Sequence, residues 1–113
     1  MSNELSQSSC EACRLDAPVL SEQEIKELSP QIPSWIVHEE DGIKRLICSF
    51  AFSSYEDSVN FTNKVAELAE QEDHHPEIVL EWGNVTVSWW SHKIKGLHKN
   101  DFICAAKTDY LSK

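Results

Sequence analysis

Histidines are the residues of this chain best suited to chemistry, and four of the five fall in two short clusters. The first cluster is the pair His74-His75, and the second holds His92 and His98. Imidazole titrates near neutral pH, so a histidine can give or take a proton without a large change in its environment. Both clusters come where a predicted helix or strand ends, which is where scaffolds often hold catalytic groups. The pattern therefore fits acid–base catalysis, with Asp73 placed to orient an imidazole.

Two other interpretations of these histidines stay open. Histidine pairs at helix ends are often solvated residues or caps, and periodicity alone favours that role over catalysis. A zinc site is the second alternative, because histidine is a common zinc ligand. The four histidines lack a recognised ligand spacing such as His-Glu-x-x-His, and Cys10-Glu-Ala-Cys13 is half of a zinc motif without its second half. We therefore expect no metal.

The composition predicts one acidic, globular domain. The chain has 113 residues, with 19 Asp and Glu against 10 Lys and Arg, and a formal net charge of −9. Such a charge repels nucleic acid and anionic membranes, so we expect neither as a partner. No apolar run approaches the roughly 20 residues that a membrane helix needs, and residues 1–9 lack the features of a secretory signal. With the four cysteines interpreted as reduced thiols, we expect a cytoplasmic protein.

Local patterns predict the elements that would position the histidines. Residues 1–19 are predicted to form a flexible polar extension, and residues 20–113 a single domain. Ser21 and Glu24 have the spacing of a capping box, which predicts a helix over 22–28. Periodicity predicts the other elements: strands over 35–38 and 43–52, a helix from Ser54 to about Glu72, strands over 78–82 and 85–90, and a helix over 100–111.

The order helix, two strands, helix, two strands, helix predicts an α+β domain. We expect an antiparallel four-stranded sheet with helices packed mainly on one face. Phe102, Ala106 and Tyr110 are predicted to share the buried stripe of the last helix. Trp89 falls on the core face of the last strand, whereas Trp90 falls on the opposite face, where it would border a site or contact another subunit. That strand is uncharged and rich in β-forming residues, and we expect it at an edge of the sheet.

Most of the chain resembles a known family, and the residues that carry the resemblance lie in its second half. The residues that carry the resemblance are Glu70-Gln71-Glu72-Asp73-His74-His75-Pro76, Trp82, Val85-Thr86-Val87, Ser91-His92, Gly96-Leu97 and Asp101. In this order and at these separations they resemble the pterin-4a-carbinolamine dehydratases, and the likeness extends from about Leu20 to the C-terminus. The run from Trp89 to His98 is similar to bacterial members associated with phenylalanine hydroxylation.

The resemblance implies a dehydratase that needs no metal and no bound cofactor. The family's site residues map to three histidines and three acidic residues, namely His74, His75, His92, Glu70, Asp73 and Asp101. The implied reaction is dehydration of a 4a-hydroxytetrahydropterin to quinonoid dihydropterin, which recycles the pterin cofactor of an aromatic amino-acid hydroxylase. His74 and His92 would divide the acid and base roles, and His75 would position the pterin. The acidic residues would bind the guanidine-like edge of the pterin or orient a histidine.

The resemblance also implies partners beyond the small-molecule substrate. Family members form dimers or tetramers by joining sheet edges and packing helices, so we expect a homodimer or homotetramer. Some animal members are also dimerisation partners of a transcription factor, so a binding protein is the alternative function. The three histidines favour the enzyme, because a pure scaffold does not need them. Trp90 stands where other members carry a small polar residue, so the resemblance assigns it no role. The natural pterin stays open, since several pterins share the same C4a chemistry.

Overall fold

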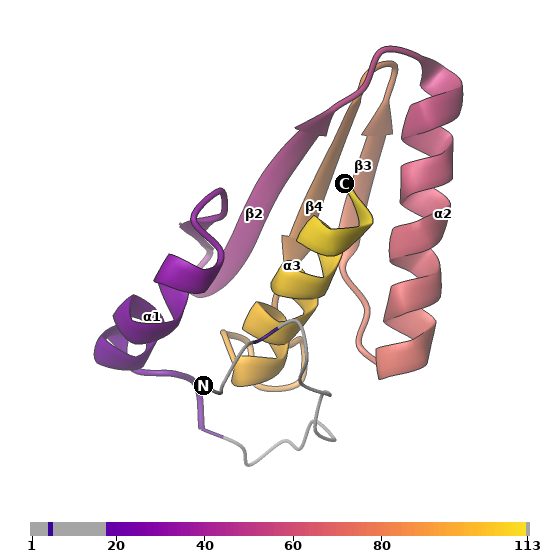
Figure 1. The fold of residues 1–113 in the computed structure, drawn as a ribbon. Coiled ribbons are helices and arrows are strands. Elements are labelled where there is room, and N and C mark those ends of the chain that lie inside the picture. The colour runs from indigo at the N-terminus through magenta and orange to yellow at the C-terminus, as the bar shows by residue number, and fades with distance from the viewer. Residues whose placement is uncertain (1–4, 6–17, 113) are drawn as a thin grey trace.

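The computed structural model describes Leu5 and residues 18–112, which form an antiparallel sheet with helices over one face (Figure 1). The elements in chain order are α1 (Glu22–Leu28), η2 (Ser29–Gln31), β1 (Ile36–Glu40), β2 (Ile43–Ala51), α2 (Tyr55–Glu72), β3 (Glu77–Glu81), β4 (Asn84–Trp89) and α3 (Lys99–Leu111). The α+β class and the four-stranded antiparallel sheet predicted from the sequence are confirmed. The turn η2 is an addition, and Pro30, which has no amide hydrogen, lies in it.

The predicted N-terminal caps of two helices are present. The Ser21 hydroxyl accepts the Glu24 amide at 3.2 Å, and the Glu24 carboxylate accepts the Ser21 amide at 2.8 Å, which completes the capping box of α1. The Ser54 hydroxyl accepts the amide of Asp57 at 3.1 Å and starts α2. These bonds satisfy amides that have no partner within the helix, so both helices begin where the sequence predicts.

Most of the expected N-terminal extension, residues 1–19, lies outside the described residues, and so do Cys10 and Cys13. Leu5 is described, and its side chain is buried in the core. The amide of Leu5 donates to Oε1 of Gln31 at 3.0 Å. The division of the chain into an extension and a domain stays a prediction.

The sheet has the order β1-β2-β4-β3, and every neighbouring pair is antiparallel. The strand β4 therefore lies inside the sheet between β2 and β3, and its prediction as an edge strand is wrong. Its residues Val85, Val87 and Trp89 are 0% exposed, which fits a central strand covered by helices. β-branched and aromatic side chains favour such half-buried positions as well as edges, so composition alone did not separate the two.

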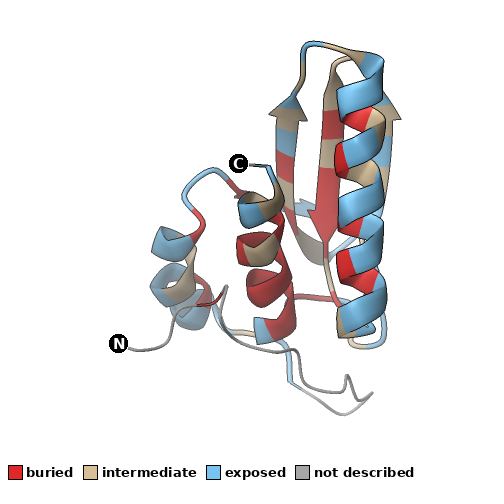
Figure 2. Cartoon of the chain, turned by 45° about the vertical axis from the view of Figure 1, so that its right-hand side comes forward, coloured by how far each residue is buried: buried red, intermediate tan, exposed pale blue. Residues whose placement is uncertain are grey.

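The helices α2 and α3 cover the same face of the sheet but differ in burial (Figure 2). α2 buries one stripe, which includes Phe61, Val65 and Leu68, and exposes its other side. α3 lies between α1 and α2 and is buried nearly all round from Asn100 to Ala106. Its last turn is more open, and Tyr110 is 58% exposed, so the prediction that Tyr110 belongs to the buried stripe is wrong. None of the described helices is both long and apolar enough to cross a membrane.

Candidate active site

The end of α2 separates the two adjacent histidines. Asp73 follows the helix in the left-handed conformation, with φ of 52°, which Asp tolerates better than most residues. The amides of Asp73 and His74 both donate to the carbonyl of Ala69, which closes the helix end. This turn leaves His74 buried, with 7% of its side chain exposed, and His75 on the surface, with 57% exposed. The two histidines therefore meet different surroundings.

His74 is held by one carboxylate and one aromatic ring. Its Nε2 lies 2.6 Å from Oδ1 of Asp101, a residue 27 positions later in the chain. Its ring stacks on Trp89, with centroids 5.6 Å apart and an angle of 13° between the planes. Because a carboxylate only accepts hydrogen bonds, Nε2 carries the proton and Nδ1 is the nitrogen left for exchange. The ring of His74 is therefore fixed in position and in tautomer.

Asp101 joins three parts of the chain at this point. It is 0% exposed and lies in the first turn of α3, where helix amides and the helix dipole stabilise negative charge. Its Oδ2 accepts the Ser91 hydroxyl at 2.8 Å and the His98 amide at 2.9 Å, while Oδ1 bonds His74. Both carboxylate oxygens are therefore engaged within the chain. The ring of His98 caps the same helix, because its Nδ1 accepts the Asn100 amide at 3.1 Å.

His92 lies in a tight loop that two backbone hydrogen bonds close. The amide of Ser91 donates to Gly96 at 2.9 Å, and the amide of Gly96 donates back to Ser91 at 3.4 Å. Lys95 has a positive φ of 54° inside the loop. A Cβ on Gly96 would lie 2.7 Å from the side chain of Val19, so only glycine fits without displacing that neighbour. His92 is exposed, but its backbone is held at both sides.

His75 forms a second histidine–carboxylate pair at the surface. Its Nε2 lies 2.7 Å from Oε2 of Glu70, which is one turn back on α2. Both side chains are mostly exposed, at 57% and 79%. Asp73 is also exposed, at the end of the same helix. The structure thus joins four of the six predicted residues in two pairs, and it joins His92 to them only through the neighbouring Ser91.

An arginine that the sequence analysis missed stands beside the site. Leu46 pairs with Trp89 at the end of β4, which brings Arg45 level with Trp90, the next residue after the strand. The guanidinium carbon of Arg45 lies 3.9 Å from the Trp90 ring centroid, and the Trp90 and His92 ring centroids are 4.3 Å apart. The alternation of Arg45 with Leu46 along its strand was the only available signal. Nothing local in the sequence connects Arg45 with a residue 45 positions later.

The site combines a buried histidine–carboxylate pair with two exposed imidazoles. The buried carboxylate can hold the ring of His74 and stabilise charge on it, and an imidazole nitrogen outside such a bond can exchange a proton with a substrate. Among the described residues, no group of three or more His, Cys, Asp or Glu side chains could hold a metal ion. The arrangement therefore suits proton transfer to and from a bound molecule.

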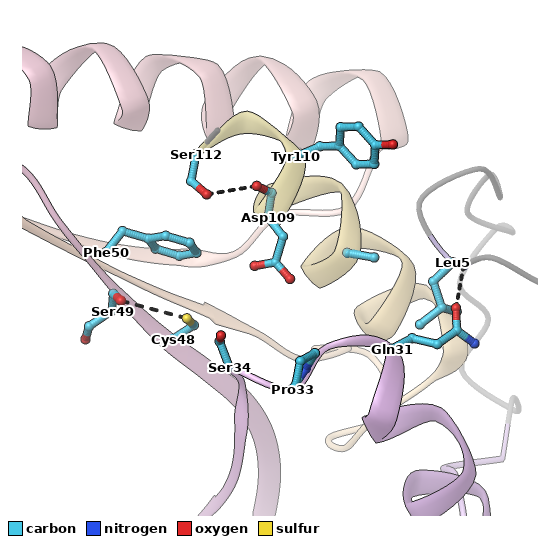
Figure 3. A pocket seen from close by; sticks show the side chains of 11 residues that line it. Leu5, Gln31, Pro33, Ser34, Cys48, Ser49, Phe50, Asp109, Tyr110 and Ser112 are labelled. Atoms are coloured by element: carbon cyan, nitrogen blue, oxygen red, sulfur yellow. Dashed lines mark hydrogen bonds between the residues drawn. The ribbon is translucent and has the colours of Figure 1, made fainter.

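A separate cavity of about 630 Å³ has none of these histidines in its lining (Figure 3). Its lining residues come from η2 and the segment after it, from β2, and from α3 and its C-cap, together with Leu5. They are Leu5, Gln31, Pro33, Ser34, Cys48, Ser49, Phe50, Ala106, Asp109, Tyr110 and Ser112. Burial, and then the negative charge of Asp109, raise the pKa of the Cys48 thiol to about 11. None of the six predicted site residues lines this cavity.

Two solved structures share the fold. One is described as a transcriptional coactivator/pterin dehydratase from Brucella melitensis, with a TM-score of 0.76 and 27% identity, over 85% of this chain and 100% of that one. The other is a pterin dehydratase-like protein described as a RuBisCO assembly factor in the alpha-carboxysome. Its TM-score is 0.60 and its identity 25%, over 70% of this chain and 89% of that one.

Two relatives that bear the name pterin-4-alpha-carbinolamine dehydratase are much more similar in sequence. The protein of Nitrosococcus oceani is 58% identical over 110 residues, which is 97% of each chain. The protein of Photobacterium profundum is 58% identical over 109 residues, which is 96% of each chain. The family model for pterin 4 alpha carbinolamine dehydratase matches residues 18–111. With this match over almost all of the described residues, the chain belongs to the pterin 4 alpha carbinolamine dehydratase family.

Proposed function

We propose that this chain removes water from a 4a-hydroxytetrahydropterin by histidine acid–base catalysis. Its family makes it a hydro-lyase that acts on a pterin carbinolamine. In this reaction the C4a–O bond breaks, the proton on N5 leaves and a C4a=N5 double bond forms, which gives quinonoid dihydropterin and water. One group must protonate the departing hydroxyl and another must accept the N5 proton. Two titratable side chains are therefore required.

The observation that carries this proposal is the 2.6 Å contact between Nε2 of His74 and the buried carboxylate of Asp101. Such a carboxylate fixes the tautomer of the ring and stabilises the positive charge that forms when the other nitrogen takes a proton. A histidine that served only as a surface residue would have no use for a fully buried acidic partner. We therefore assign Nδ1 of His74 as the base that accepts the N5 proton. Asp101 orients that ring and does not reach the pterin.

His92 is the proposed acid, which protonates the departing hydroxyl. It is exposed to solvent, in a loop whose first residue, Ser91, bonds the same carboxylate as His74. An exposed imidazole can recover its proton from water after each turnover. His75 is assigned to position the pterin, while Glu70 and Asp73 bind its guanidine-like edge, because all three present exposed polar groups at the end of α2.

The test is the dehydration of an enzymatically generated 4a-hydroxytetrahydropterin, followed by ultraviolet absorbance. We expect the wild type to accelerate the reaction, and His74→Ala and His92→Ala each to lose about 10²- to 10⁴-fold in kcat. His38→Ala is the matched control, because His38 is an exposed histidine on β1 whose contact is an ion pair with Glu40 at 3.8 Å. Its kcat should equal that of the wild type. No acceleration by the wild type over buffer would refute the proposal and favour the binding-protein alternative.

The structure of the carbinolamine indicates which reaction supplies it to this enzyme. A 4a-hydroxytetrahydropterin is the product expected when a tetrahydropterin-dependent hydroxylase delivers one oxygen atom to an aromatic amino acid. We assign this chain to the recycling of that cofactor in the cytoplasm. In a coupled assay with a limiting tetrahydropterin, a dihydropterin reductase and a phenylalanine hydroxylase, adding the chain should raise the steady rate of tyrosine formation. An unchanged rate of tyrosine formation would contradict the role in cofactor recycling and leave the dehydratase activity itself untouched.

Self-association through the edge of the sheet is also part of the proposal. All five residues of the edge strand β1 are exposed, and Ile36 is 62% exposed. Unpaired strand edges with apolar side chains tend to pair with a second chain. Light scattering should therefore give the mass of a dimer or tetramer, and proline at Val37 should reduce that mass by removing a backbone donor. A wild-type mass of one chain would contradict this.

A further inference from the structure

The ring of His92 depends on one aromatic neighbour for its orientation. His92 is exposed, and no hydrogen bond or ion pair reaches its ring within residues 18–112 or from Leu5. Its one ring contact is with Trp90, whose centroid lies 4.3 Å away at an interplanar angle of 34°. The loop fixes the backbone of His92 but leaves the rotation of its side chain open. Trp90 is therefore the side chain, in the described part of the chain, that can orient this ring.

Trp90 is itself held from the neighbouring strand. The guanidinium of Arg45 lies 3.9 Å from the Trp90 ring, in the geometry of a cation–π contact. The Arg45 side chain is only 13% exposed, and one of its guanidinium nitrogens lies 3.9 Å from the carboxylate of Glu77. Its Nε is buried without a hydrogen-bond partner in the described part of the chain. Burying that nitrogen is unfavourable, and the cation–π contact with Trp90 is a favourable interaction that offsets part of this cost.

We infer that Trp90, held by Arg45, is a positioning residue that orients the imidazole of His92 for its proton transfer. This inference rests on the proposed function, because it gives Trp90 a task only where His92 acts on the substrate. A surface side chain free to rotate samples several rotamers, and proton transfer requires one of them. Contact with a ring that Arg45 holds in place selects that rotamer before the substrate arrives. Trp90 itself exchanges no proton.

The kinetic experiment compares Trp90→Ser with Trp90→Phe, which keeps an aromatic ring. Trp82→Ser is the matched control, because Trp82 is 71% exposed and lies in the turn between β3 and β4. We expect Trp90→Ser to lower kcat about tenfold with little change in KM, since the pterin is held by other residues. Trp90→Phe should recover most of the loss, and Trp82→Ser should match the wild type. Arg45→Met should fall between wild type and Trp90→Ser.

A double substitution separates positioning of His92 from a general structural role. In a chain that already carries His92→Ala, Trp90→Ser should cause no further loss of kcat, because there is no ring left to orient. Light scattering should give the same mass for Trp90→Ser and the wild type. Additive losses, or a lower mass for Trp90→Ser, would overturn the inference, because Trp90 would then act through the fold or through subunit contact.

Proton NMR gives a readout that does not use the reaction. The carbon-bound ring protons of His92, assigned with His92→Ala, should be shifted by the ring current of Trp90. Trp90→Ser should return them to the values of a free histidine, and Trp82→Ser should not. If the wild type is active and Trp90→Ser changes neither kcat nor the His92 proton shifts, this inference alone is overturned. An inactive wild type would remove the proposed function and this inference together.

Discussion

His74 and His75 are neighbours in the chain, and each binds one carboxylate through Nε2 at nearly the same distance, 2.6 Å and 2.7 Å. They differ in surroundings: the pair of His74 with Asp101 is buried, and the pair of His75 with Glu70 is exposed. An exposed pair is screened by water and contributes little to stability. A buried pair leaves an unsatisfied polar group when either partner is removed. Position in the fold, more than residue type, therefore decides which pair the structure depends on.

Removing the buried carboxylate should have the largest effect. We expect Asp101→Ala to lower the free energy of unfolding by about 3–5 kcal/mol, because His74, Ser91 and the His98 amide all lose their acceptor. Urea unfolding followed by tryptophan fluorescence measures this change. Asp101→Asn keeps one acceptor oxygen and should lose less. A loss below about 1 kcal/mol for Asp101→Ala would mean that solvent enters and replaces the network.

Ser91→Ala tests one arm of the same network. Only the hydroxyl that donates to Oδ2 of Asp101 is removed, and that oxygen keeps the His98 amide. We expect the free energy of unfolding to fall by about 1.5–3 kcal/mol, in the range for one hydrogen bond to a charged group. Ser112→Ala is the control, since its hydroxyl bonds a carbonyl at an exposed helix end. If both substitutions lower the free energy of unfolding equally, the buried hydrogen bond of Ser91 is no stronger than the exposed one of Ser112.

Local patterns were sufficient for the elements that carry a strong local signal. α2 has a cap at Ser54, an apolar stripe and a left-handed residue at its end, and its predicted bounds agree with the structure. α3 is buried by its neighbours on almost every side, so its burial does not follow the single stripe that periodicity predicts. The exposure of Tyr110 depends on where those neighbours stop, and periodicity carries no such information. The central place of β4 likewise depends on pairing with both β2 and β3.

The candidate site was predicted as a set of residues but not as an arrangement. Nothing near His74 and His75 indicates which of them is buried, since this follows from the turn at Asp73 and from Asp101 on another helix. The contact of Arg45 with Trp90 is equally long-range. Sequence separation hides such contacts because they form only after the sheet and helices have packed. Residue types therefore indicated the chemistry, and tertiary structure assigned the partners.

Cys48 extends the comparison to a buried group whose ionised form gains nothing from its neighbours. Its folded-state pKa is raised from 9.0 to about 11, by burial and then by the charge of Asp109. Between these values the folded chain holds the proton that the unfolded chain has lost, so stability falls as pH rises from about 9 toward 11. Between pH 8 and 10 the wild type should lose about 1 kcal/mol more than Cys48→Ala, in parallel urea titrations. Equal losses of stability in the two proteins would mean that the Cys48 thiol ionises as readily in the folded chain as in the unfolded chain.

The exposed pair should show the smallest effect on stability. We expect Glu70→Ala to change the free energy of unfolding by less than about 0.5 kcal/mol, because the pair is exposed and water solvates His75 when its partner is removed. If Glu70 and His75 hold the pterin, the same variant should raise KM by about two- to tenfold, as for one lost hydrogen bond, with kcat nearly unchanged. Glu67→Ala, an exposed glutamate one turn back on α2, is the control for both readings. A stability loss as large as that of Ser91→Ala would break the comparison, because burial would no longer distinguish the two pairs.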